Sequence, residues 1–228
     1  MTGFFSYCNE DIVIVAMDTL VTCKDHTPTN IVSKIIPLLH SRSLICPMGD
    51  IDLAFAAFEF IEKNIICQDV SSLVHYFNFS MSSFIKMFKE RYSYDPNGTL
   101  YIFGYNVINS VYESYKIEIR GTVGQVSKCE YGYMARPGEG IVDPENYDLL
   151  VNPHSDNFMD LFIEAIREMK RIDDERPKDK KWGIGGHCQV CLLREQGYHL
   201  VSSPMADFEK TYGNVVNKSM NGESTIDD

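Results

Sequence analysis

The first fifty residues alternate between short apolar runs and polar breaks, a pattern typical of β-strands. Ile12–Met17 is a continuous apolar run that ends at Asp18, which predicts a strand buried on both faces. Leu20–Cys23 continues it after a kink. Two further strands are expected, over Ile31–Leu39 and over Ser43–Cys46, and Pro47-Met48-Gly49 is expected to end the second.

Helical periodicity begins at Asp50. Over Asp50–Ile66 and Asp69–Tyr92, apolar side chains recur at three- and four-residue steps, and aspartates at the start of each segment can cap a helix. Because only a short link separates the two segments, we expect them to pack as a helical hairpin. A third helix is predicted over Asn157–Ile172.

Between and after these helices, alternating or β-branched segments separated by turn residues predict more strands. They are Thr99–Tyr105, Val111–Arg120, Val123–Met134 and a final hairpin of Trp182–Arg194 with Tyr198–Ser202. This order of elements predicts an α+β fold in which helices cover a sandwich of two sheets. We expect one domain over residues 1–216 and a polar, frayed tail over residues 217–228.

Composition narrows the expected partners and compartment. The 32 acidic residues against 21 basic ones give a net charge of −11, which repels phosphate backbones and argues against nucleic acid. The N-terminus lacks a basic region, and no stretch approaches the about 20 apolar residues that a membrane span needs. We therefore expect a cytoplasmic chain without a membrane partner, with its seven cysteines as reduced thiols.

Three residues near the N-terminus suggest chemistry. Thr2 follows the initiator Met1, Asp18 lies sixteen positions after Thr2, and Lys34 lies thirty-two positions after it. Once Met1 is removed, a threonine at the chain terminus carries both an attacking hydroxyl and an α-amine that can accept its proton. A nearby lysine would lower the pKa values of both groups, and an aspartate would hold that lysine in place.

The sequence around these residues resembles the start of proteasome β-subunits, which are N-terminal-nucleophile (Ntn) hydrolases. The similar segments are DIVIVAMDTLVT, VSKIIPLL and LICPMGDIDLAF, and the family has its Asp and Lys at the spacing found here. The helix beginning at Asp50 resembles that of the bacterial relatives. The late segment GIGGHCQVCLL resembles the Gly-Gly and strand element of the family.

The resemblance implies a four-layer αββα sandwich and hydrolysis of an amide bond through an acyl-enzyme ester. It makes Thr2 the nucleophile and base, Lys34 the residue that lowers its pKa, and Asp18 the partner of Lys34. It implies a peptide or protein substrate and a homo-oligomer of rings, with the Asp50–Tyr92 helix pair as contact surface. No cofactor or metal is expected.

The sequence departs from the family in three places. Met1 must first be removed. The tightest alignment puts Pro47, which has no N–H, where the family has an oxyanion-hole glycine, although a shift of two residues would let Gly49 serve. The supporting Ser and Asp of the family have no clear equivalent, and Asp173 or Asp174 is the candidate for the late Asp.

Alternative sites are weaker. Cys188 and Cys191 form a Cys-x-x-Cys pair, but no second ligand pair has a spacing suited to zinc, and strand positions three apart face opposite ways. We therefore expect them to be core thiols. Cys8 lies only ten residues before Asp18, which does not suit a processed nucleophile, and His26 is expected on a surface loop.

Two other functions compete with a threonine peptidase. A catalytically inactive proteasome-like subunit would keep the fold and assemble into rings, and Pro47 favours it. An Ntn amidase for a small metabolite would have a narrow closed pocket in place of an open groove.

Overall fold

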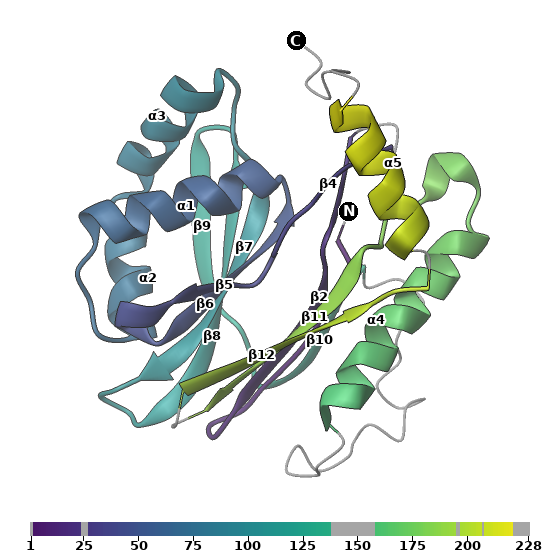
Figure 1. The fold of residues 1–228 in the computed structure, drawn as a ribbon. Coiled ribbons are helices and arrows are strands. Elements are labelled where there is room, and N and C mark those ends of the chain that lie inside the picture. The colour runs from purple at the N-terminus through teal and green to yellow at the C-terminus, as the bar shows by residue number, and fades with distance from the viewer. Residues whose placement is uncertain (1, 24–26, 138–157, 195–196, 207, 221–228) are drawn as a thin grey trace.

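The computed structural model describes residues 2–23, 27–137, 158–194, 197–206 and 208–220. Two five-stranded sheets face each other, and helices cover the outer side of each (Figure 1). The predicted four-layer αββα sandwich, an α+β fold, is therefore confirmed.

The first sheet is antiparallel throughout, in the order β10-β1-β2-β11-β12. Its strands are β1 (Phe4–Cys8), β2 (Val13–Asp18), β10 (Gly132–Arg136), β11 (His187–Arg194) and β12 (Gly197–Pro204). Every residue of β2 is buried, because one face of this central strand packs on the other sheet and the other face packs on α4 (Phe158–Glu175). Burial of both faces explains why the sequence of β2 is continuously apolar up to Asp18.

The second sheet is also antiparallel, in the order β5-β6-β7-β8-β9. Its strands are β5 (Ile36–Leu38), β6 (Ser43–Gly49), β7 (Asn97–Asn106), β8 (Val111–Arg120) and β9 (Val123–Lys128). A separate ribbon of β3 (Leu20–Thr22) and β4 (Pro28–Ile31) follows directly after β2.

The space between the sheets is filled by apolar side chains from both of them. Phe4 of β1 stacks on Tyr101 of β7 with ring centroids 4.9 Å apart, and both side chains are buried. Such offset aromatic pairs stabilise the contact between the two sheets by more than the burial of their apolar area alone.

The helices lie where their apolar stripes predict. α1 (Ile51–Asn64), α2 (Val70–Phe79) and α3 (Met81–Tyr92) cover the second sheet, and α4 covers the first. Two short 3₁₀ helices, η1 (Leu39–Ser41) and η2 (Lys178–Lys180), complete the described helices together with α5 (Phe208–Met220), which contacts β4.

The predicted Asp69–Tyr92 helix is two helices, interrupted at Ser80, whose φ of −92° and ψ of 9° leave the helical region. Phe60 of α1 packs edge-on against Phe77 of α2 and Phe84 of α3. The change of direction at Ser80 lets both helices present a ring to the same residue.

Three strand predictions need correction. Val123–Met134 is not one strand, because β9 belongs to the second sheet and β10 to the first. Ile31–Leu39 is not one strand either, since β4 ends at Ile31 and β5 begins at Ile36. Pro47 does not end β6: β5 pairs with β6 only as far as Ile45, so Pro47 lies where one side of the strand is an edge, which tolerates proline.

The sequence pattern missed β1 and α5. β1 carries consecutive aromatics in place of an alternating pattern. α5 runs to Met220, so helix covers the first four residues of the stretch predicted as a frayed tail, and residues 221–228 lie outside the described residues. The single-domain assignment of residues 1–216 stays a prediction. No helix within the described ranges is long and apolar enough to span a membrane.

Candidate active site

Asp18 and Lys34 form a buried ion pair at the end of β2. Both oxygens of the Asp18 carboxylate lie 3.0 Å from the Lys34 ammonium nitrogen. The side chains are 0% and 4% exposed, so water does not screen the attraction between them. The structure thus brings together two of the three residues that the spacing predicted.

The segment between β4 and β5 positions Lys34. The Val32 N–H donates to the Thr19 carbonyl at 2.9 Å, which ties the segment to the end of β2. Ile35, the residue after Lys34, is buried in the core between the sheets and so fixes the chain on that side. Lys34 is therefore held between two fixed neighbours.

Asp18 also accepts three backbone hydrogen bonds. The donors are the N–H groups of Gly3 at 2.9 Å, Leu20 at 3.2 Å and Gly185 at 3.3 Å. One carboxylate therefore joins the N-terminal segment, the β2–β3 junction and the segment before β11. The sequence does not predict Gly185 as a site residue, although its GIGG segment resembles the Gly-Gly element of the family.

Burial sets the electrostatics of the pair. Complete burial lowers the pKa of Lys34, because desolvation penalises the ammonium, and the negative charge of Asp18 opposes that shift. Burial likewise raises the pKa of Asp18, opposed by Lys34 and by the N–H groups of Gly185 and Gly3. Each charge thus depends on the other to remain in the interior.

Thr2 lies beside this pair. Gly3 donates its N–H to the Asp18 carboxylate, and its carbonyl accepts the Asp18 N–H at 3.2 Å, which fixes the residue next to Thr2. Thr2 is 4% exposed and lines a pocket of about 40 Å³ together with Lys34. The other lining residues are Leu20, Val21, Thr22, Pro47, Gly49 and Ile51.

The ammonium of Lys34 already has three acceptors. They are the two Asp18 oxygens and the carbonyl of Leu20 at 2.5 Å. A lysine ammonium has three N–H donors, so these contacts match its full capacity. Its influence on Thr2 in this arrangement is therefore that of a nearby positive charge.

The two oxyanion candidates both line the pocket. Pro47 has no N–H to donate. Gly49 has a φ of +102°, a conformation that favours glycine, and it ends β6 just before the Asp50 cap of α1. Gly49 is thus the residue of the two that can offer a backbone donor.

Asp173 supports the site from a distance. It is buried and accepts hydrogen bonds from the N–H groups of Trp182, Gly183 and Ile184, the last two at 2.9 Å. It therefore holds the segment from which Gly185 reaches Asp18. Asp174, the other candidate, is 54% exposed and forms surface ion pairs with Lys170 and Lys181, so the geometry separates it from the pocket.

The cysteines do not form a second centre. Cys188 lies in the core beneath α4 and Cys191 in the core between the sheets, so their side chains face opposite ways as predicted. Burial raises the pKa of Cys8, Cys188 and Cys191 to about 12, which keeps these thiols protonated at neutral pH. Across the described ranges no three His, Cys, Asp or Glu side chains are grouped so that they could hold a metal ion. His26 lies outside the described residues.

Comparison with known proteins supports the fold alone. No protein-family model and no curated protein sequence matches the chain. Among solved structures, Anbu (ancestral beta-subunit) from Yersinia bercovieri matches 100% of this chain and 98% of its own, with a TM-score of 0.61 and 9% sequence identity. The chain therefore has a proteasome-like fold.

Proposed function

We propose that the chain is a proteasome-like threonine hydrolase that cleaves amide bonds of peptides after removal of Met1. The observation that carries the proposal is one pocket lined by both Thr2 and Lys34, with Lys34 bound by the buried Asp18. The proteasome-like fold agrees with it.

In the proposed reaction, the freed α-amine of Thr2 accepts the proton of the Thr2 hydroxyl while the oxygen attacks the amide carbon. The tetrahedral intermediate then expels the amine of the substrate, which takes that proton, and leaves an acyl ester on Thr2. Water then adds to the ester carbon, the bond to the Thr2 oxygen breaks, and the acyl group leaves as a carboxylic acid while Thr2 regains its hydroxyl. The charge of Lys34 lowers the pKa values of the hydroxyl and the α-amine, and Gly49 is the candidate donor to the oxyanion.

The test is intact-mass analysis after treatment with a peptide epoxyketone, which reacts with the hydroxyl and the α-amine of one N-terminal threonine. We expect a chain without Met1 that gains one probe, and we expect Thr2→Ala to gain none. Lys34→Ala should label at least about tenfold more slowly, since a positioned charge contributes on that scale. Lys86→Gln, which changes an exposed side chain of α3 outside the pocket, is the matched control and should label normally.

A second candidate is an inactive subunit with a structural role. Two observations favour it: the three donors of Lys34 are matched by Asp18 and Leu20, and the pocket at Thr2 holds only about 40 Å³. Retention of Met1, or absence of labelling on a chain that has lost Met1, would decide for this candidate.

Assembly and location belong to the same proposal. By analogy with the family that the sequence resembles, the chain forms homo-oligomeric rings, works in the cytoplasm and uses no cofactor. A small-metabolite amidase would also leave the peptide epoxyketone unreacted, and hydrolysis of short amides by the chain without Met1 would distinguish it from an inactive subunit.

A further inference from the structure

A second, larger cavity lies at the opposite end of the sandwich from Thr2. It has a volume of about 340 Å³, within the usual range of small-molecule sites. β6 runs from Ser43, which lines this cavity, to Gly49, which lines the Thr2 pocket. Its seven residues span roughly 20 Å at about 3.3 Å each, so the two sites are separate.

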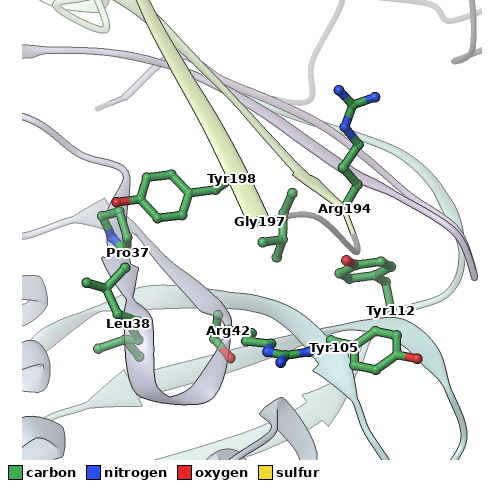
Figure 2. Close-up of a pocket in the computed structure, with 11 residues that line it drawn as sticks. Pro37, Leu38, Arg42, Tyr105, Tyr112, Arg194, Gly197 and Tyr198 are labelled. Atoms are coloured by element: carbon green, nitrogen blue, oxygen red, sulfur yellow. The ribbon is translucent and has the colours of Figure 1, made fainter.

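The walls of the cavity come from both sheets. Leu38, Tyr105 and Tyr112 belong to the second sheet, and Leu193 and Tyr198 belong to the first. Figure 2 shows the Tyr198 hydroxyl directed toward Pro37, with Tyr105 and Tyr112 together on the other side. The rings of Tyr105 and Tyr112 meet edge to face at 5.1 Å, which forms a firm aromatic wall.

Arg42 supplies the charge. In Figure 2 its side chain extends toward Tyr105, whereas the guanidinium of Arg194 points away from the other labelled residues. The Arg42 backbone is fixed from two sides, because its N–H donates to Leu39 and its carbonyl accepts from Tyr105, both at 3.4 Å. The second of these bonds holds the Arg42 backbone against β7, the strand that carries Tyr105.

The ion pairing of the two arginines that line the cavity bears on the kind of ligand it can hold. The protein carries a net charge of −11, yet within the described residues neither Arg42 nor Arg194 forms an ion pair. None of the described residues that line the cavity is acidic. A guanidinium without a carboxylate partner, next to an aromatic wall, can bind a carboxylate through two parallel hydrogen bonds.

We infer that this cavity binds a small organic carboxylate with an aromatic or branched apolar body. Arg42 holds the carboxylate, and Tyr105, Tyr112, Leu193 and Tyr198 enclose the apolar part. The inference does not depend on Thr2 or on the proposed hydrolysis.

The test is calorimetric titration of the full chain with 3-phenylpropionate and with its uncharged amide. We expect a dissociation constant of about a millimolar or below for the acid, as suits a ligand of this size. The amide should bind at least about tenfold more weakly, since a charge-assisted pair is lost. Backbone amide signals of Leu39, Arg42 and Leu193 should shift on titration, which places the ligand in this cavity.

Variants make the test specific. Arg42→Gln should weaken the acid at least about tenfold and leave the amide unchanged, while Arg42→Lys should fall between. Tyr198→Ala should weaken both ligands, because it removes an apolar wall. Arg120→Gln is the control for a lost surface charge, and circular dichroism confirms that each variant is folded. Equal affinity of the acid for the wild type and a folded Arg42→Gln, equal affinity of acid and amide, or no binding to the wild type would overturn the inference.

Discussion

The buried pair of Asp18 and Lys34 shows how one residue pair can serve both stability and a candidate reaction. A buried ion pair contributes little relative to apolar residues of the same volume, but loss of one partner leaves an uncompensated charge in the interior. Here loss of Asp18 would also remove the acceptor that the N–H groups of Gly3, Leu20 and Gly185 share. The same contact therefore fixes the N-terminal segment and the pocket.

Replacing Lys34 by Met should lower the free energy of unfolding by about 3–5 kcal/mol, because Asp18 stays buried without its cation. The double variant Asp18→Asn with Lys34→Met should lose less than the sum of the two single variants, since neither charge is then left alone. Urea unfolding of the four proteins measures the coupling. Additive losses would show that the two side chains act independently.

Glu113 of β8 is another buried carboxylate, and it has neutral as well as charged partners. Lys128 lies 2.5 Å away, the Tyr115 hydroxyl 2.7 Å and the Asn106 amide 3.0 Å. Burial alone would raise the pKa of Glu113, but the hydrogen bonds from Lys128, Tyr115 and Asn106 outweigh it and hold the pKa below its ordinary value. Its ionised form is thus the one that the fold stabilises.

The stability that Glu113 contributes should therefore depend on pH. A lowered folded-state pKa gives stability that is present above the unfolded value of about 4.3 and is lost as pH falls through the folded value. Glu113→Gln should be clearly less stable than the wild type at pH 7, and the difference should shrink below about pH 4. Urea midpoints across this range test it, with the exposed Glu90→Gln as control. A difference that stays constant with pH would contradict the assignment.

At the scale of elements, the close approach of α2 to β7 depends on Gly104. A Cβ atom at this position would lie 2.4 Å from the Ser43 hydroxyl and 2.8 Å from Cβ of Val70. Neither neighbour can withdraw easily, because Ser43 is paired in β6 and Val70 begins α2. The helix layer can therefore sit on the sheet only where this side chain is absent.

Gly104→Ala should cost about 1–3 kcal/mol of unfolding free energy, as expected for overpacking of a filled core. Gly213 offers the opposite case, since it lies within α5 and a Cβ there meets nothing within 4 Å. Gly213→Ala should stabilise the protein by about 0.5–1 kcal/mol through helix propensity. Thermal unfolding of both variants shows whether each one stabilises or destabilises the protein. A Gly104→Ala variant as stable as the wild type would show that α2 can shift away from β7.

The sequence predicted elements well where one local signal determined them. α1 was recognised from its apolar stripe and its Asp50 cap, and the predicted bounds of β8 match the structure. Prediction from the sequence failed where contacts between distant segments determine the bounds of an element. The apolar stripe continues in phase across Ser80, so nothing local marks the break that Phe60 requires. Likewise, only the fold separates β9 and β10 into different sheets.

The residues of the candidate site also fall into two groups, those that the sequence could predict and those that only the fold reveals. Thr2, Asp18 and Lys34 could be named because their spacing resembles that of a known family, and the structure places all three around one pocket or its supporting ion pair. Gly185 could not be named, because its N–H reaches Asp18 across 167 positions of sequence. Asp173 and Asp174 could not be told apart, since their difference is burial alone.

For the molecule as a whole, the sandwich has two open ends with different chemistry. Thr2, Lys34 and Gly49 gather at one end, and Arg42 with its tyrosines gathers at the other. β6 reaches from one to the other within the same rigid sheet. The proposed reaction site and the proposed binding site thus share one core without sharing a residue.

The outer helix layer suggests how copies of the chain associate. α1, α2 and the loop between them expose Phe55, Ile66, Tyr76 and Phe79, and the last is 85% exposed. Figure 1 places α1 and α2 on the side of the second sheet that faces away from the first sheet. Exposed apolar groups on one layer are typical of an association surface, and both helices lie within Asp50–Tyr92, the segment that the family resemblance predicts as a contact surface.

We therefore expect light scattering to give a molar mass several times the 26.0 kDa of one chain. Phe79→Ser should lower that mass, because it removes an apolar side chain that association would bury. Ile108→Ser is the matched control, since Ile108 is 84% exposed but lies between β7 and β8, outside the helix layer. A wild type that remains at the mass of one chain would refute ring assembly. An equal loss in both variants would move the contact surface away from α1 and α2.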